Sequence, residues 1–413
     1  MTVPVLIAGI SCTHLGKRPL DSVKSLVAEA VAAALLDAGA RADQVEAAWF
    51  SNTRQPMLEG QNTIRGQIAL RPLGICGIPV VNIENACASG SSALIQAMAA
   101  IRAGMADIAL VVGAEKMVFP DRPEAVAAAF LGGTDIHDLD KTKDYARALG
   151  VDVDDESNGR RSIFMDLYAA QARLHMQHFG TVQEDFARIA AKNHSHARHN
   201  PRAQFRTPMS VEQVMGDRLI SFPFTRAMCA PVSDGAAAAV VCSPAGLRRL
   251  SGTAGRAVGI RASVLRSATV RPPAAFDQHI GHLTALAAYE VAGLGPADVD
   301  LAEVHDATAY AELQQIENLG LATPGTVGER LRHGDFALGG RQPVSASGGL
   351  LAKGHPVGAT GLIQLHDLCN QLRGEAGPAQ VEDARIGIAE NGGGFLGGEE
   401  GATVVTILER LSA

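Results

Sequence analysis

The sequence predicts an α/β fold made of two similar halves, each with a mainly parallel sheet and helices packed around it. Short hydrophobic runs, such as residues 108–112 and 237–241, have the length of buried strands. The 44 glycines, with 47% hydrophobic but only 4% aromatic residues, suit close packing of helices on sheets. A chain of 413 residues is too long for one ordinary core, so we expect two or three domains.

The third observation is an internal repeat at an offset of 255 residues. In each half an alanine-rich helix leads through a glycine turn into a strand. Chance matching among alanines is the alternative, but the shared order of elements favours duplication. The aligned residues are Ala32-Ala33 with Ala287-Ala288, Ala42-Asp43 with Ala297-Asp298, Ala47 with Ala302 and Thr53 with Thr308.

Charge and composition exclude several classes of protein. The net charge of −7 gives no reason to expect nucleic-acid binding, and no hydrophobic run is long enough to span a membrane. The N-terminal stretch is typical of a first strand rather than a signal peptide, and the C-terminus carries no peroxisomal or lipidation signal. The six cysteines form no CxxC pair, so we expect neither a zinc site nor disulfides. These features predict a cytoplasmic protein with reduced thiols.

Cys87 is the first candidate for chemistry. It follows a predicted strand (residues 78–83) and precedes a helix marked by Leu94, Met98 and Ile101 at helical spacing. Small neighbours permit a sharp turn there, and the start of a helix favours the thiolate that acts as a nucleophile. The alternative is a buried structural cysteine, as most free cysteines are.

His355 is the second candidate, in the glycine-rich stretch SASGGLLAKGHPVGATG (residues 345–361). Such a backbone lets a substrate carbonyl approach closely, and an imidazole exchanges protons near neutral pH. A lone histidine is more often an ordinary surface or core residue. One enclosed by glycines, with a candidate nucleophile in the other half of the chain, is better explained as catalytic.

These two stretches resemble the thiolase superfamily over nearly the whole chain. The resemblance includes residues 191–206 and 228–246, EVHDAT (residues 303–308) and the C-terminal segment NGGGFLGGEEGATVVTIL. SGGLLAKGHP together with His305-Asp306 is similar to the sterol-carrier-protein type of thiolase. The resemblance implies five stacked layers, α-β-α-β-α. It divides the chain into an N-terminal half (residues 1–117 and about 221–255), an inserted loop domain over the CoA site (118–220) and a C-terminal half (256–413).

The resemblance also implies roles for residues. His355 would activate Cys87, whose backbone N–H would be one oxyanion donor, and His305 with His355 would bind the second thioester oxygen. Asp306 would orient His305, or else be an ordinary loop acid, and Gly393 would support the oxyanion site.

The chain departs from the family at the second cysteine. Ala307 stands where the sterol-carrier type has cysteine, and Glu390 and Asn391 stand where other thiolases have their C-terminal cysteine motif. Cys229 and Cys369 are not obvious substitutes. Glu390 with a pKa raised by burial could be the missing base, or Asn391 could occupy the cysteine position while a histidine moves the proton.

CoA is expected as substrate, and its phosphates require basic partners. The candidates are Lys192, Arg198, Arg202, Arg206, Arg160 and Arg161, with Ser347 at the pantetheine arm. A solvated charged face, and a turn for Ser347, are the alternatives.

The sequence therefore predicts a CoA-dependent C-acyltransferase that forms an acyl-Cys87 thioester, in thiolysis of a 3-oxoacyl-CoA or in the reverse Claisen condensation. The alternatives are acyl transfer to another activated carbon nucleophile and an acyl-CoA-binding subunit that needs a separate zinc-ribbon/OB-fold partner. A ketoacyl-synthase-type enzyme and a retro-aldolase without a nucleophilic cysteine fit the motifs less well. We expect a homodimer or tetramer, and no permanently bound cofactor or metal.

Overall fold

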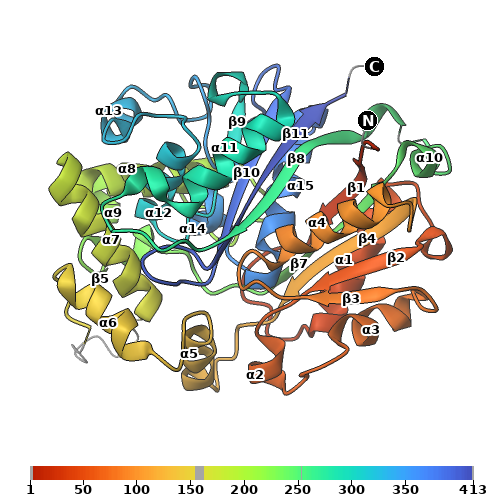
Figure 1. Ribbon diagram of the computed structural model, residues 1–413, viewed down its shortest axis with the longest axis horizontal. Helices are drawn as coiled ribbons and strands as arrows, with labels where there is room; N and C mark the ends of the chain where they lie inside the picture. The colour runs from red at the N-terminus through yellow and green to blue at the C-terminus, as the bar shows by residue number, and fades with distance from the viewer. Residues whose placement is uncertain (1–2, 154–161, 253, 412–413) are drawn as a thin grey trace.

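The computed structural model describes residues 3–153, 162–252 and 254–411, and its centre is a nine-stranded mixed sheet (Figure 1). The strand order is β3-β2-β4-β7-β1-β8-β11-β10-β9, and β5 and β6 form a separate two-stranded sheet. The strands are Leu6–Cys12 (β1), Ala47–Ser51 (β2), Val80–Ile83 (β3), Ile108–Glu115 (β4), Leu219–Ser221 (β5), Phe224–Thr225 (β6), Gly235–Cys242 (β7), Val258–Ser267 (β8), Leu301–Glu303 (β9), Ile386–Gly393 (β10) and Ala402–Arg410 (β11).

The expectation of mainly parallel sheets is wrong. β2 runs parallel to β3 and β4, and β9 runs parallel to β10. The pairs β4–β7, β7–β1, β1–β8, β8–β11 and β11–β10 are antiparallel. The hydrophobic runs predicted the strands themselves, but a run of buried residues carries no information about strand direction.

The two halves repeat the same topology, which confirms the duplication. Counted from the β1–β8 junction, the orders are β1-β7-β4-β2-β3 and β8-β11-β10-β9, with matching directions. A parallel bridge between Ala302 and Val344 lies where β3 lies in the first half. The aligned alanine pairs 32–33 and 287–288 fall in α1 (Val23–Asp37) and α11 (Ile280–Ala292), and Ala47 and Ala302 fall in β2 and β9.

The sheet is folded into two layers around two central helices, α4 (Ser89–Arg102) and α15 (Thr360–Arg373), as Figure 1 shows. One hydrophobic cluster joins these helices to strands of both halves. A second cluster packs α1 and α3 (Arg65–Leu70) on the outer face of the first half. A third packs α11 and α12 (Ala309–Asn318) on the outer face of the second half. The five-layer arrangement is therefore confirmed.

The segment between the halves is mainly helical. Its two long helices are α7 and α8, and the Ser162 hydroxyl caps α7 by accepting the Phe164 N–H. Both pack on the outer helices of the second half. The boundaries 118 and 220 stay a prediction. The helices of this segment are Pro123–Leu131 (α5), Leu139–Ala148 (α6), Ile163–Phe179 (α7), Gln183–Ala197 (α8) and Val211–Met215 (α9).

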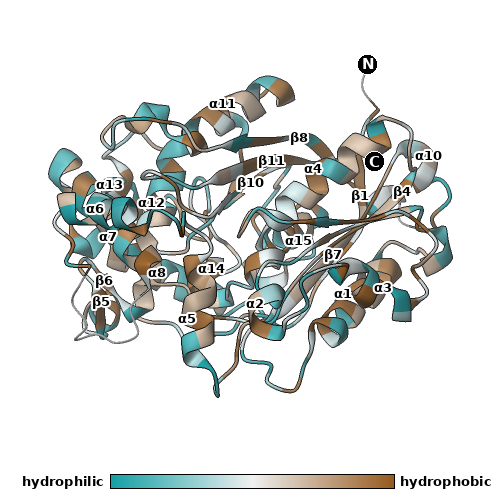
Figure 2. Cartoon of the chain, turned by 60° about the horizontal axis from the view of Figure 1, so that its bottom comes forward, coloured by the Kyte–Doolittle hydropathy of each residue, from teal (hydrophilic) through white to brown (hydrophobic). Residues whose placement is uncertain are grey.

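Hydrophobic residues concentrate on the strands and inner helix faces, whereas α6 at the edge of the molecule is largely hydrophilic (Figure 2). None of the described helices has the length and apolar character needed to cross a lipid bilayer. The remaining helices are Gln55–Glu59 (α2), Pro244–Leu247 (α10), Val327–Arg332 (α13) and Gly349–Lys353 (α14).

Candidate active site

Cys87 lies in a tight turn between β3 and α4. Ala86 has a φ of 47°, in the left-handed region, and the turn closes through hydrogen bonds from the Ala88 N–H to Asn85 O at 3.0 Å and from the Asn85 N–H to Ser89 Oγ at 2.8 Å. Such a backbone costs about 1–3 kcal/mol and persists where the surroundings impose it. The end of β10 presses on this turn, because a Cβ at Gly393 would lie 2.3 Å from Asn85 O. The sharp strand-to-helix turn expected from the sequence is confirmed.

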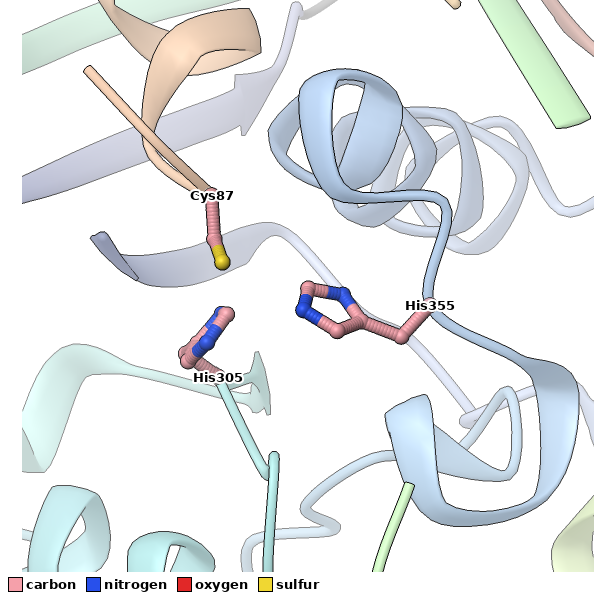
Figure 3. A group of neighbouring side chains, drawn as sticks. All are labelled: Cys87, His305 and His355. Atoms are coloured by element: carbon pink, nitrogen blue, oxygen red, sulfur yellow. The ribbon is translucent and has the colours of Figure 1, made fainter. Parts of the chain in front are cut away.

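His305, just after β9, and His355, between α14 and α15, lie beside Cys87 (Figure 3). One ligand atom from each of the three side chains lies within 4.8 Å of the other two. The two imidazole rings are 5.1 Å apart between centroids, and both histidines are buried. Residues separated by more than 200 positions therefore form one cluster, whose donor atoms would also suit a soft divalent metal ion.

The tautomer of His355 is fixed by Thr360. The Thr360 hydroxyl has one proton, which it donates to Pro356 O at 2.9 Å, so it accepts a hydrogen bond from His355 Nδ1–H at 2.7 Å. Nε2 is then left with a free lone pair. Burial lowers the pKa of His355 well below its usual value, so the ring is neutral and can accept a proton from Cys87.

His305 is held in the opposite tautomer. The Asn391 amide Nδ2 donates to His305 Nδ1 at 3.3 Å, while the Ser91 hydroxyl donates to Asn391 Oδ1 at 2.9 Å and so fixes the orientation of the amide. Burial lowers the pKa of His305 to about 4. The ring is therefore neutral with its proton on Nε2, which makes it a hydrogen-bond donor rather than a base.

The Cys87 thiol is protonated at rest. Burial raises its pKa to about 11, and this outweighs the Arg54 charge and the Gly394 backbone N–H, which both lower the pKa. The helix start predicted to favour the thiolate therefore does not dominate. Because His355 is also neutral, proton transfer from Cys87 to His355 accompanies attack on the substrate instead of preceding it.

Glu390 and Asp306 have other partners than the reacting groups. Glu390 Oε2 accepts the His305 backbone N–H at 3.1 Å, and burial raises the pKa of Glu390 well above its usual value. Asp306 accepts the Leu350 N–H at 2.7 Å and Asn193 Nδ2–H at 2.8 Å, so it joins α14, the helix just before His355, to α8. Among the residues that the structure describes, neither carboxylate has a hydrogen bond to an imidazole.

A cavity of about 890 Å³ opens at Cys87, His305 and His355. Its wall is mostly apolar and comes largely from the segment between the two halves. The larger apolar and aromatic side chains around it include Met117, Phe130, Phe164, Met165, Tyr168, Phe205, Met209, Ile220, Val232 and Leu351. This chemistry suits an acyl chain and a pantetheine arm.

Of the basic residues predicted to bind CoA, the structure brings Arg206 to the cavity wall. Lys192 Nζ pairs with Glu312 at 2.8 Å, and Arg202 Nε donates to Cys12 O at 2.8 Å. Ser347 is bonded to Glu303 and Lys353 inside the protein. Arg198 does not line the cavity, and Arg160 and Arg161 lie outside the described residues. Lys17, Arg218 and Arg226 line the cavity and were not identified from the sequence.

The chain matches two family models, described as "Thiolase, N-terminal domain" (residues 5–222) and "Thiolase C-terminal domain-like" (residues 279–410). The chain belongs to the thiolase family. It is 35% identical to an acetyl-CoA acetyltransferase of Methanothermobacter thermautotrophicus, over 98% of this chain and 99% of that protein. It is 34% identical to sterol carrier protein 2 of Bos taurus, over 98% of this chain and 72% of that protein. The prediction of a thiolase-type acyltransferase is confirmed.

A solved structure titled "Ltp2-ChsH2(DUF35) aldolase" has a chain with the same fold. It aligns with a TM-score of 0.75 and 23% identity, covering 98% of this thiolase and 97% of that chain.

Three further residues at the site were not predicted from the sequence or were set aside there. Thr360 lies within the quoted motif GHPVGATG, where a hydroxyl five residues after the histidine was the available signal. Cys229 lines the cavity, and its neighbour Ala230 donates its N–H to Ala307 O at 3.0 Å. Arg54 also lines the cavity and had no signal beyond its place after a strand.

Proposed function

We propose that this thiolase transfers an acyl group between a CoA thioester and a carbon atom through a covalent thioester on Cys87. The observation that carries the proposal is the cluster of Cys87, His305 and His355 within 4.8 Å, with the two histidines held in opposite tautomers. One imidazole accepts a proton and the other donates a hydrogen bond, which are the two functions that acyl transfer requires.

In the first half-reaction, His355 Nε2 takes the thiol proton as Cys87 Sγ attacks the carbonyl of the substrate. For a 3-oxoacyl-CoA the attacked carbon is C3. The backbone N–H groups of Gly394 and Cys87 both interact with the sulfur, so they are positioned to stabilise the oxyanion beside it. The C2–C3 bond then breaks and leaves the shortened acyl group on Cys87 and the enolate of acetyl-CoA, which keeps C1, C2 and the CoA moiety.

The enolate oxygen accepts a hydrogen bond from His305 Nε2–H. Protonated His355 then returns its proton to the enolate carbon. In the second half-reaction, the thiol of free CoA gives its proton to His355, and its sulfur attacks acyl-Cys87. Cys87 leaves as the thiolate and regains the proton. Claisen condensation is the same sequence in reverse, so one site serves both directions.

A second candidate is a thiolase that acts with a partner subunit or on another activated carbon nucleophile. The absence of the family's second cysteine favours it, because Ala307 and either Glu390 or Asn391 stand at the corresponding positions. The similar solved structure names a DUF35 component beside its thiolase-fold chain. The homodimer or tetramer and the cytoplasmic location stay predictions.

Intact-protein mass spectrometry tests the proposal. The full chain is incubated with acetyl-CoA and a panel of acyl- and 3-oxoacyl-CoAs, and free CoA is then added. We expect one acyl adduct, located on Cys87, that free CoA removes. Cys87→Ala should form none, and Cys76→Ala should react as the wild type does, since Cys76 is exposed and outside the cavity wall. No adduct with any donor would leave the partner-dependent alternative as the better account.

A further inference from the structure

Arg54 is a buried cation at the reacting end of the cavity. It follows β2 and precedes α2, and it is 7% exposed. It lines the cavity together with Cys87, and its charge acts on both Cys87 and His355. The guanidinium therefore belongs to the wall of the cavity that holds Cys87 and His355, and its charge acts on both of these reacting groups.

The partners of the Arg54 guanidinium within the described residues do not neutralise it. Nη1 donates to Ala129 O, in the last turn of α5, and the guanidinium carbon lies 5.2 Å from the centre of the Phe130 ring. Nε is buried and has no hydrogen-bond partner. A carbonyl and an aromatic face leave most of the charge uncompensated, and an unpaired buried charge is costly.

Glu115 is the carboxylate that interacts with Arg54, but its oxygens are already used. Oε1 accepts Asn52 Nδ2–H at 3.0 Å and the Arg54 backbone N–H at 2.9 Å. Oε2 accepts the N–H and hydroxyl of Thr53 and the Gly358 N–H at 2.9 Å. Glu115 thus fixes the backbone on both sides of the site and forms no ion pair with the guanidinium among the described residues.

The geometry points to a subsite for a second carboxylate on the acyl substrate, with Arg54 as its binding residue. An arginine fork binds a carboxylate through paired, charge-assisted hydrogen bonds. The phosphates of CoA are separated from the thioester by the pantetheine arm, so the anion beside Cys87 belongs to the acyl part. The inference deepens the proposed function, because it assumes that the acyl group lies at Cys87.

The surroundings of Arg54 specify the rest of the ligand. Phe130 and Phe164 meet edge to face at 6.5 Å between centroids, and both line the cavity next to Tyr168. The subsite therefore combines one cation with an aromatic wall. It fits an acyl-CoA whose free carboxylate is carried on an apolar or aromatic skeleton.

Matched donors test the inference. Glutaryl-CoA and pentanoyl-CoA have the same chain length and differ in a terminal carboxylate against a methyl group, as do succinyl-CoA and butyryl-CoA. We would measure the second-order rate constant of Cys87 acylation for each pair. For the wild type we expect the carboxylated donor of at least one pair to react about 10-fold faster or more.

Arg54→Met should lower this carboxylate preference by about 10- to 100-fold, and Arg54→Lys should retain part of it. Arg122→Met is the matched control, since Arg122 stacks on Phe119 outside the cavity wall, and it should keep the wild-type preference. If Arg54→Met lowered the acylation rate constant equally for both donors of a pair, the role of the Arg54 charge would be to stabilise the Cys87 thiolate. That result would overturn the inference. A wild type without preference in either pair would also overturn it.

Dissociation constants of the same four thioesters, measured by calorimetry with Cys87→Ala, separate the inference from the proposed function. The proposed function fails but the subsite stands if no donor acylates the wild type while Cys87→Ala binds a carboxylated thioester about 10-fold more tightly than its methyl-terminated partner. This preference must be lost in Cys87→Ala/Arg54→Met. If acylation proceeds but neither rates nor affinities favour the carboxylate, the inference fails alone.

Discussion

Thr360→Val tests the assignment of His355 as the base. The substitution keeps the shape of the side chain and removes the oxygen that accepts His355 Nδ1–H at 2.7 Å. The reactive tautomer would then leave a buried donor without a partner, which costs about 1–3 kcal/mol. At 1.4 kcal/mol per factor of ten, we predict that acylation of Cys87 slows by about 5- to 150-fold.

The assay is single-turnover acylation of Cys87, followed by quenched-flow mass spectrometry. Thr360→Ser retains the hydroxyl and should stay within about threefold of the wild type, which separates tautomer control from a packing defect. A Thr360→Val enzyme that acylates at the wild-type rate would refute the assignment. So would equal losses in Thr360→Val and Thr360→Ser.

Four further predictions follow from the geometry. Asn391→Leu removes the hydrogen-bond donor that keeps the proton on His305 Nε2. Cleavage of a 3-oxoacyl-CoA should therefore slow by about tenfold, whereas acylation by a simple acyl-CoA should change little. Steady-state rates with these two donors check this prediction. Alkylation of Cys87 by iodoacetamide should rise about tenfold per pH unit from pH 7 to 9, since the thiolate fraction grows until the pKa of about 11, and a plateau near pH 8 would contradict that pKa. Asp234→Asn breaks the buried ion pair with Lys116 at 2.6 Å and should lower the free energy of unfolding by about 3–5 kcal/mol in urea titrations. Micromolar Zn²⁺ should block Cys87 acylation and EDTA should restore it, because three ligand atoms lie within 4.8 Å of one another; inhibition that EDTA does not reverse would argue against binding at this cluster.

The catalytic pair was predictable because each member lies in a short, locally determined segment. Small residues around Cys87 and glycines around His355 describe turns that few side chains permit, and Ala86 at φ 47° shows how tight the first turn is. The repeat was predictable for a similar reason. The aligned alanines in α1 and α11 belong to equivalent helices, which pack on equivalent strands in the two halves.

The charged residues were less predictable, because a basic side chain can turn toward solvent, substrate or its own protein. Lys192 and Arg202 belong to one basic segment, yet one pairs with Glu312 and the other binds the carbonyl of Cys12. Those partners lie more than 100 positions away in the sequence. Strand direction could not be predicted for the same reason. β7 lies between β4 and β1 in the sheet, but in the sequence it follows the whole inserted segment.

The missing second thiol constrains how the proposed reaction can proceed. Asn391 is an amide and His305 has a pKa of about 4, so neither matches a thiolate as a base for removing a proton from carbon. In the cleavage direction no such base is required: His355 takes the proton of Cys87 and returns it to the enolate carbon. In condensation with an unactivated acyl-CoA, neutral His355 must remove a carbon-bound proton, although its pKa is also lowered. Because this step is the reverse of the proton return in cleavage, both directions share one transition state. We therefore propose that the residues present favour substrates whose carbon acid is more acidic than a simple thioester.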